Sequence, residues 1–223
     1  MLKIGVLLPG RFSEAGDYLA DARALEAAGV DSLWLPGDGF DPWLVLAGVA
    51  SVTGRVRLAV PVSARDGADP DGLNRRLDTL TTLSRGRVMP TVAAGSDGAG
   101  TEALIACARG DGRPVLLRAD GGAPALLASR LADGLVAAQE PPLCRATFAQ
   151  VRDRRARDGR SASFELWTHL ARPTGRDAWR EALAAAAATG ATGVVVPADP
   201  RLLDLVRNAD EEEDRSDLTL AQG

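Results

Sequence analysis

Short runs rich in Val, Leu and Ile alternate along this chain with longer stretches rich in Ala, Leu and Arg. The longer stretches place apolar residues at helical spacing, as Tyr18, Ala22 and Leu25 illustrate. Strands that alternate with helices predict a parallel sheet joined by right-handed crossovers. The expected strands cover residues 3–8, 32–36, 55–62, 87–93, 114–119, 134–137, 163–171 and 193–197. The sequence therefore predicts an α/β protein built from repeated βα units.

About eight such βα units predict a compact, closed (β/α)8 TIM-type barrel, with an open doubly wound sheet as the alternative. Closure is favoured because the turn after the first strand, Gly10–Gly16, does not match the G-x-G-x-x-G pattern of open dinucleotide-binding sheets. The segments Ala28–Pro36 and Thr189–Pro197 also resemble each other, as repeats of one βα unit would. At 223 residues the chain is near the lower size limit of such barrels, so short loops are expected.

The expected helices include residues 42–52, where Asp41 is a plausible N-cap and Pro42 suits the first turn. The region between the fourth and fifth strands is short and has the weakest helical signal. Residues 96–100 are rich in Gly, and residues 102–109 can form only about two turns. We expect one domain over residues 1–207, followed by an acidic tail at 208–223 that has no apolar period and is expected to be solvated or disordered.

Composition excludes several classes of function. The net charge of −4 gives no electrostatic basis for binding nucleic acid or an anionic membrane. A local group of arginines over residues 152–157 is interpreted as a solvated helix face. The single His and two distant Cys residues predict neither a metal site nor a disulfide framework. No apolar run is long enough to span a membrane, and the N-terminus reads as a strand rather than a secretory signal, so a cytoplasmic protein acting on a small molecule is expected.

The carboxyl ends of the strands are the expected site, because barrels of this kind place their ligands there. Small residues dominate these ends, which suits a flat ligand held by main-chain amides. The best anion site is the turn of Gly121, Gly122 and Ala123, where the free amides and dipole of a helix start attract phosphate. A plain β-to-α turn is the competing interpretation. Ala94, Gly95 and Ser96 form a second group of amide and hydroxyl donors.

Two side chains are candidates for catalysis. His169, the only histidine, shares a strand face with Trp167 and could act as a general base or bind a ring, although a structural histidine is the commoner case. Asp38 lies in the stretch Trp34–Phe40, WLPGDGF, where two glycines suit either a tight turn or the close approach of a ligand. Glu140 could also polarise a ligand. Patterns of serine hydrolases and H-E-x-x-H metalloproteases do not occur.

An ordered series of short motifs resembles the bacterial luciferase-like monooxygenase superfamily of flavin- and deazaflavin-dependent oxidoreductases. The resemblance is close over residues 1–95 and extends in outline over nearly the whole chain. The most specific piece is Leu83–Val88, LSRGRV, which runs on to Ala93–Gly95. The other pieces are Lys3–Val6, Ala22–Pro36, Asp41–Trp43, Thr53–Leu58, Arg76–Leu80, Arg113–Val115, Gly121–Gly122 and Leu131–Gly134.

The resemblance implies an eightfold barrel that binds a reduced flavin, such as FMN, or a deazaflavin at its carboxyl-terminal mouth. It implies that Gly121, Gly122 and Ala123 hold the cofactor phosphate. It further implies that Pro61–Val62 and Ala94–Gly95 lie beside the ring and ribityl chain, while family members are often homodimers and some work with a flavin reductase. The chain departs from the family in its short segment between the fourth and fifth strands and in Asp38, where many members place a histidine or another polar group. Two hypotheses follow: a compact oxidoreductase, or a non-catalytic flavin-binding relative or partner subunit.

Overall fold

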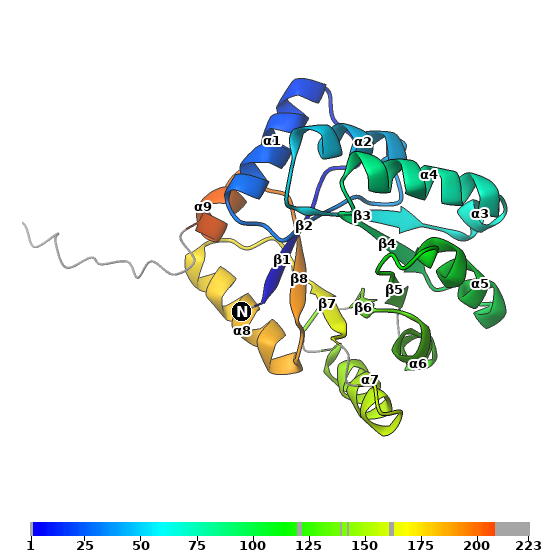
Figure 1. Ribbon diagram of the computed structural model, residues 1–223. Helices are drawn as coiled ribbons and strands as arrows, with labels where there is room; N and C mark the ends of the chain where they lie inside the picture. The colour runs from blue at the N-terminus through cyan, green and yellow to red at the C-terminus, as the bar shows by residue number, and fades with distance from the viewer. Residues whose placement is uncertain (1, 120–121, 139, 142, 161–162, 208–223) are drawn as a thin grey trace, which may run out of the picture.

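The computed structural model describes residues 2–119, 122–138, 140–141, 143–160 and 163–207. Over these residues the sheet is a closed parallel barrel in which each strand pairs with its sequence neighbours and β1 pairs with β8 (Figure 1). The predicted TIM-type barrel is confirmed. The strands are β1 Lys3–Leu7, β2 Ser32–Trp34, β3 Arg57–Val62, β4 Val88–Ala93, β5 Leu116–Ala119, β6 Gly134–Ala137, β7 Glu165–His169 and β8 Gly193–Pro197.

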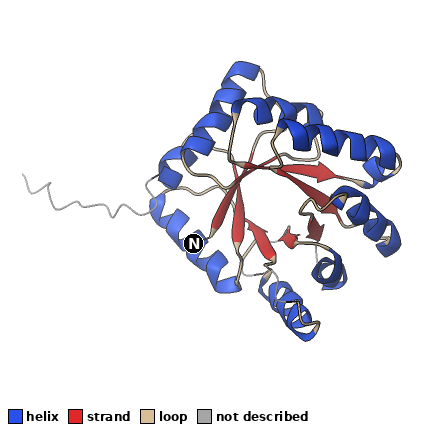
Figure 2. Ribbon diagram, viewed as in Figure 1, coloured by secondary structure: helices blue, strands red, loops and turns tan. Residues whose placement is uncertain are grey.

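Helices surround the ring of strands on the outside (Figure 2). Their apolar faces pack on the outward-facing strand residues and form the larger of two hydrophobic clusters. Among the described residues no helix is long and apolar enough to cross a bilayer. The helices are α1 Ala15–Ala27, α2 Pro42–Val52, α3 Ala64–Gly67, α4 Pro70–Leu83, α5 Gly98–Arg109, α6 Gly122–Leu131, α7 Arg145–Arg157, α8 Arg176–Thr189 and α9 Leu202–Arg207.

Side-chain caps decide where several helices begin. The Asp41 carboxylate accepts hydrogen bonds from the amides of Trp43 and Leu44, so the predicted start of α2 is confirmed. The expectation of a two-turn helix over 102–109 is wrong, because the Asp97 carboxylate caps the amides of Ala99 and Gly100 and starts α5 at Gly98. The helical pattern of the sequence does not reveal the start of α5 at Gly98, because a glycine-rich first turn has low helix propensity.

The short helix α3 was not expected from the sequence. It is held by a reciprocal capping box between Ser63 and Asp66, in which the Asp66 carboxylate accepts from the Ser63 amide and hydroxyl. The connection from β4 to β5, by contrast, contains α5 alone among the elements of the described chain. The predicted short region between the fourth and fifth strands is therefore confirmed.

The barrel interior is filled by a second, smaller hydrophobic cluster. The indole rings of Trp34 and Trp167 meet edge to face there, with centroids 5.3 Å apart. Glycines make room for them, since a Cβ at Gly5 would lie 2.3 Å from Trp34 Nε1 and one at Gly193 would lie 2.5 Å from the Trp167 ring. The interior is thus packed around two large side chains and is a core, not a pore.

A charged group closes the amino-terminal end of the barrel. The Glu165 carboxylate accepts hydrogen bonds from Lys3 Nζ, from Arg57 Nη1 at 2.9 Å and from the indole N–H of Trp167 at 2.8 Å. Burial alone would raise the pKa of Glu165, but the Lys3 hydrogen bond and the nearby Arg57 charge outweigh it and lower the pKa. The group lies at the end opposite the expected site, so we assign it to stability.

The interpretation of residues 152–157 as a solvated face is wrong at one position. Arg155 is only 8% exposed, donates to the Ser129 carbonyl at 3.1 Å and lies 4.3 Å from the centre of the Phe164 ring. It falls one helical turn after Val151, on the face of α7 that packs against the barrel. Arg155 can occupy this buried position because its aliphatic stem packs against apolar residues while its guanidinium stays hydrogen-bonded.

Candidate active site

The carboxyl-terminal mouth of the barrel is floored by one layer of inward-pointing side chains. The strand registers set the heights of the side chains, and alternate strands contribute to each layer. This layer, whose members are partly exposed, comprises Leu7 of β1, Pro61 of β3, Arg118 of β5 and His169 of β7. Their inward direction follows from alternation, because Ala59, Leu116 and Trp167 two residues earlier belong to the interior cluster.

Arg118 is the one exposed residue of β5, whose other three residues are buried. It faces the open mouth, and within the described residues no carboxylate forms an ion pair with it. His169 occupies the same layer and is half-buried. In this layer of the described structure Arg118 supplies a guanidinium and His169 an imidazole, and the other two members are apolar.

Thr91 lies in the layer directly below, on the strand next to that of Arg118. Its side chain is 9% exposed, and its hydroxyl oxygen is buried without a hydrogen-bond partner in the described structure. The register pairs Thr91 with Pro61 on one side and with Leu116 on the other, which directs it inward between two apolar residues. A buried hydroxyl without a partner is costly, so this atom marks a place where a ligand or water would be stabilised.

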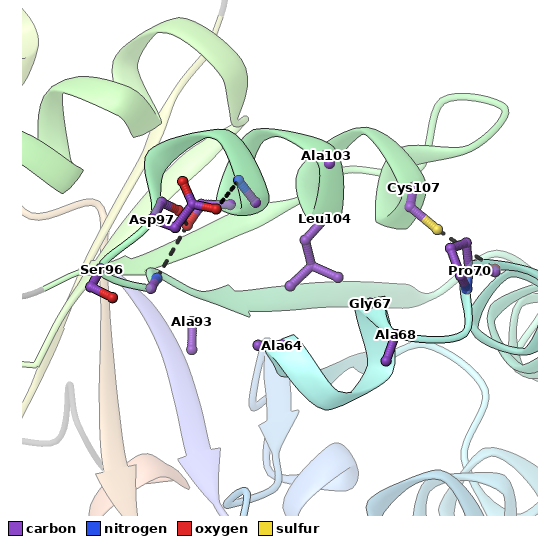
Figure 3. A pocket seen from close by; sticks show the side chains of 13 residues that line it. Ala64, Gly67, Ala68, Pro70, Ala93, Ser96, Asp97, Ala103, Leu104 and Cys107 are labelled. Atoms are coloured by element: carbon purple, nitrogen blue, oxygen red, sulfur yellow. Dashed lines mark hydrogen bonds between the residues drawn. The ribbon is translucent and has the colours of Figure 1, made fainter.

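The turn after β4 borders a cavity of about 480 Å³ that opens beside the mouth between α3 and α5. Figure 3 shows its mainly small lining, with Leu104 pointing from α5 toward α3. Gly95 and Ser96, which the sequence proposed as cofactor contacts, line this cavity, but two of the expected donors are already used. The Ala94 amide donates to the Arg118 carbonyl at 2.9 Å, and the Gly95 amide donates to Thr101 Oγ1 at 3.1 Å. Ser96 is exposed and remains the polar group of this turn that a ligand can reach.

The glycines around Asp38 have a structural role. Gly39 has φ +116, and the Phe40 amide donates to the Gly10 carbonyl at 2.8 Å, so the loops after β1 and β2 lie in contact. The Asp38 carboxylate is exposed and makes no hydrogen bond or ion pair with any described residue. It stands at the rim on the β2 side of the barrel, beyond the layer that contains His169.

The remaining predicted contacts divide between the mouth and its surroundings. Gly122 begins α6, directly after the β5 strand, and Ala123 is exposed in its first turn, which carries no acidic residue. Gly121, the other member of that predicted phosphate turn, lies outside the described residues, as does the acidic tail. Pro61 is in the floor layer, whereas Val62 points outward into the core under the helices and is 1% exposed. Glu140 is exposed after β6.

The structure thus brings Pro61 and His169 together with two residues that sequence reasoning missed, Arg118 and Thr91. The alternation of side chains along the strand could have indicated Arg118. It is a charged residue in an apolar strand, one position before the strand ends, and it faces the barrel mouth because its two neighbours face the helices. The described residues contain no cluster of three His, Cys, Asp or Glu side chains that could hold a metal ion. A layer with one guanidinium, one imidazole and two apolar side chains suits an organic ligand bearing an acidic group.

These features define a (β/α)8 barrel whose carboxyl-terminal mouth is the candidate ligand site. The model of the luciferase-like monooxygenase family matches residues 2–104, from β1 into α5. The resemblance inferred from the sequence is therefore confirmed. A comparison with curated protein sequences returned no match.

Solved structures share the whole fold at low identity. The coenzyme F420-dependent tetrahydromethanopterin reductase of Methanopyrus kandleri superposes with a TM-score of 0.77 at 12% identity, covering 94% of this chain and 98% of that chain. An F420-dependent secondary alcohol dehydrogenase in complex with an F420-acetone adduct superposes with a TM-score of 0.77 at 13% identity, covering 93% of this chain and 98% of that chain. Monooxygenase RslO1 from Streptomyces bottropensis superposes with a TM-score of 0.70 at 14% identity, covering 93% of this chain and 96% of that chain. At these identities the likeness establishes the shared barrel.

Proposed function

We propose that this protein is a luciferase-like oxidoreductase that uses reduced FMN or a deazaflavin coenzyme on a small organic substrate. The observation that carries the proposal is the floor layer of the mouth, in which Arg118 and His169 share one level of the barrel with apolar Pro61. The cavity between α3 and α5 adjoins this mouth at Ala93, which pairs with Arg118. The family match and the F420- and monooxygenase-type relatives support the same class of chemistry. When bound, the cofactor would supply hydride transfer or oxygen activation.

The chain itself would bind, orient and shield that cofactor. Pro61 offers a flat apolar contact for a ring, and Ser96 can donate to its polar edge. The first turn of α6, with Gly122 and Ala123, offers amides to the phosphate, and Gly121 is proposed to contribute to the same turn. His169 is placed to hold or move a proton at the ring or substrate, and Asp38 at the rim would contact only a ligand that extends beyond the barrel.

The test is a spectral titration of the purified protein with FMN and, separately, with the deazaflavin coenzyme F420. We expect saturable binding of one of them in the micromolar range. Gly122→Asp should weaken binding at least tenfold, because it places a carboxylate at the proposed phosphate amides. Gly16→Asp, in the first turn of α1, is the matched control and should leave binding unchanged. Failure of both cofactors to bind at tens of micromolar would refute the oxidoreductase proposal.

A second candidate is a flavin-binding relative without turnover, or a partner subunit of another luciferase-like chain. It is favoured by the short β4–β5 connection, in which α5 alone stands next to the cavity. If the chain binds a cofactor but fails to reoxidise it in the presence of oxygen or candidate substrates, this second function replaces the first. A homodimer, a flavin reductase partner and a cytoplasmic location stay predictions.

A further inference from the structure

The part of the chain that the structure describes supplies no counter-charge to Arg118 inside the barrel. Of the described inward-facing strand residues, Glu165 alone carries a carboxylate, and it is bound by Lys3 and Arg57 at the opposite end. The guanidinium of Arg118 is a planar fork of donors, so an anion in the mouth would gain a charge-assisted, bidentate partner. The position thus selects for a negatively charged group on whatever ligand reaches the floor layer.

Thr91 gives this position a second, independent polar group. Its buried hydroxyl lacks a partner, and it points into the interior one layer below Arg118 on the adjacent strand. A hydroxyl can donate to an oxyanion while the guanidinium binds the remaining oxygens. His169, in the same layer as Arg118, stands on the next-but-one strand and flanks the same space.

The opposite wall is apolar. In the closed strand order β1 lies across the barrel from β5, and β3 lies across from β7, so Leu7 faces Arg118 and Pro61 faces His169. Trp34 and Val195 belong to the layer beneath and are buried. A ligand on this floor would therefore meet a cationic, hydroxyl-bearing side and a hydrophobic side.

We propose that Arg118 and Thr91, flanked by His169, form an oxyanion-binding subsite that receives the carboxylate or phosphate of a small, otherwise apolar organic acid. The inference deepens the proposed function, on which it rests for calling this acid the substrate; the first turn of α6 is left to the cofactor phosphate. Arg118 is assigned as a substrate-binding residue and Thr91 as its hydroxyl partner, and both would determine specificity for acids over neutral analogues.

The first test titrates the protein with inorganic phosphate and with succinate at low ionic strength. Anion binding is measured by tryptophan fluorescence, to which Trp34 and Trp167 below the subsite contribute, and in parallel by calorimetry. We expect saturable binding of at least one of the two anions. Arg118→Met should weaken it tenfold or more, and Thr91→Val, which keeps shape and removes the hydroxyl, should weaken it about threefold to tenfold. Arg23→Met, which removes an exposed arginine on α1, is the control and should change nothing. Equal affinity in wild type and Arg118→Met, or no binding of either anion by wild type, would overturn the subsite.

The second test separates the two sources of the anion by comparing FMN with riboflavin, which lacks the phosphate. If the substrate supplies the anion, Arg118→Met keeps the wild-type preference for FMN and loses succinate or phosphate binding to the FMN-loaded protein. If Arg118→Met abolishes the preference for FMN, the subsite holds the cofactor phosphate and the substrate assignment is wrong. Arg118-dependent anion binding by a protein that binds no flavin or deazaflavin would retain the subsite and refute the oxidoreductase.

Discussion

Gly39 lies directly against Gly10, so that a Cβ added at Gly39 would stand 2.2 Å from the Gly10 carbonyl oxygen. This contact joins the loops after β1 and β2 at the rim of the mouth, and it explains one of the two glycines that surround Asp38. One of them, Gly39, is required by a positive φ and a close backbone approach, whereas a Cβ at Gly37 would meet no atom within 4 Å.

Gly39→Ala should therefore destabilise the protein by about 1–3 kcal/mol, because the new methyl group meets backbone atoms and φ is strained. Gly37→Ala is the matched control and should change the free energy of unfolding by less than about 0.5 kcal/mol. Urea unfolding of both variants measures the difference. Equal stabilities would show that the two loops can separate without cost.

Asp38→Ala should leave folding stability within about 0.5 kcal/mol of wild type, since the exposed carboxylate bonds to no described residue. The same variant tests catalysis once a substrate is known. Full activity would assign Asp38 to the turn, and a loss in kcat with unchanged cofactor affinity would assign it to the chemistry.

Gly193→Ala should destabilise the barrel by about 1–3 kcal/mol through overpacking, because the added Cβ would lie 2.5 Å from the Trp167 ring in a filled interior. The environment of Trp167 should change too, so near-ultraviolet circular dichroism is the second readout. Gly175→Ala, where no atom lies within 4 Å of the added Cβ, is the control. An unperturbed aromatic spectrum in Gly193→Ala would contradict tight packing of the two tryptophans.

Glu165→Gln should lower the free energy of unfolding at pH 7 by about 1.5–3 kcal/mol, the cost of weakening hydrogen bonds to charged groups in a partly buried site. The Glu165 pKa is lowered from its ordinary value of 4.5, so the folded state binds a proton less readily than the unfolded chain. This stabilisation is complete above about pH 4.5 and is lost as the pH falls through the folded-state pKa.

The stability difference between wild type and Glu165→Gln should consequently narrow in acid and persist at neutral pH. Denaturant unfolding at a series of pH values from 7 to 3 measures it. Glu14→Gln, which removes an exposed carboxylate at the start of α1 that makes no cap hydrogen bond, should show no such pH dependence. A difference that grows below pH 4.5 would have the wrong sign for a lowered pKa.

Much of the fold could be predicted because its signals are local. The helix of residues 42–52 was predicted to the residue from Asp41 and Pro42, and the strands at 134–137 and 193–197 from short apolar runs bounded by Gly and Pro. The predictions failed where tertiary contacts or caps outweigh local pattern. The Asp97 cap lets α5 begin in a glycine-rich turn, before the predicted start. Arg155 is buried because it lies on the face of α7 that packs against the barrel.

The candidate site was predicted less completely, since it depends on which faces of different strands meet. Of the residues proposed from the sequence, Pro61 and His169 share the floor layer, whereas Val62, which the family resemblance implied to lie beside the ring, faces the helices. It passed over Arg118 and Thr91, because neither stands in a glycine-rich turn or a known motif. Their importance follows from closure of the sheet, which directs them into one space.

The sequence by itself determined the βα repeat, the number of units and the luciferase-like pattern of the first half of the chain, because strand and helix periodicity and capping residues act over a few positions. Only the tertiary structure decided which side chains share a layer. Closing the barrel at a fixed register placed Arg118, His169 and the unpartnered Thr91 hydroxyl around one mouth, and it bound Glu165 to Lys3 and Arg57 at the other end. These partners are separated by many residues along the chain, and register and layer are properties of the closed sheet, which no local pattern encodes.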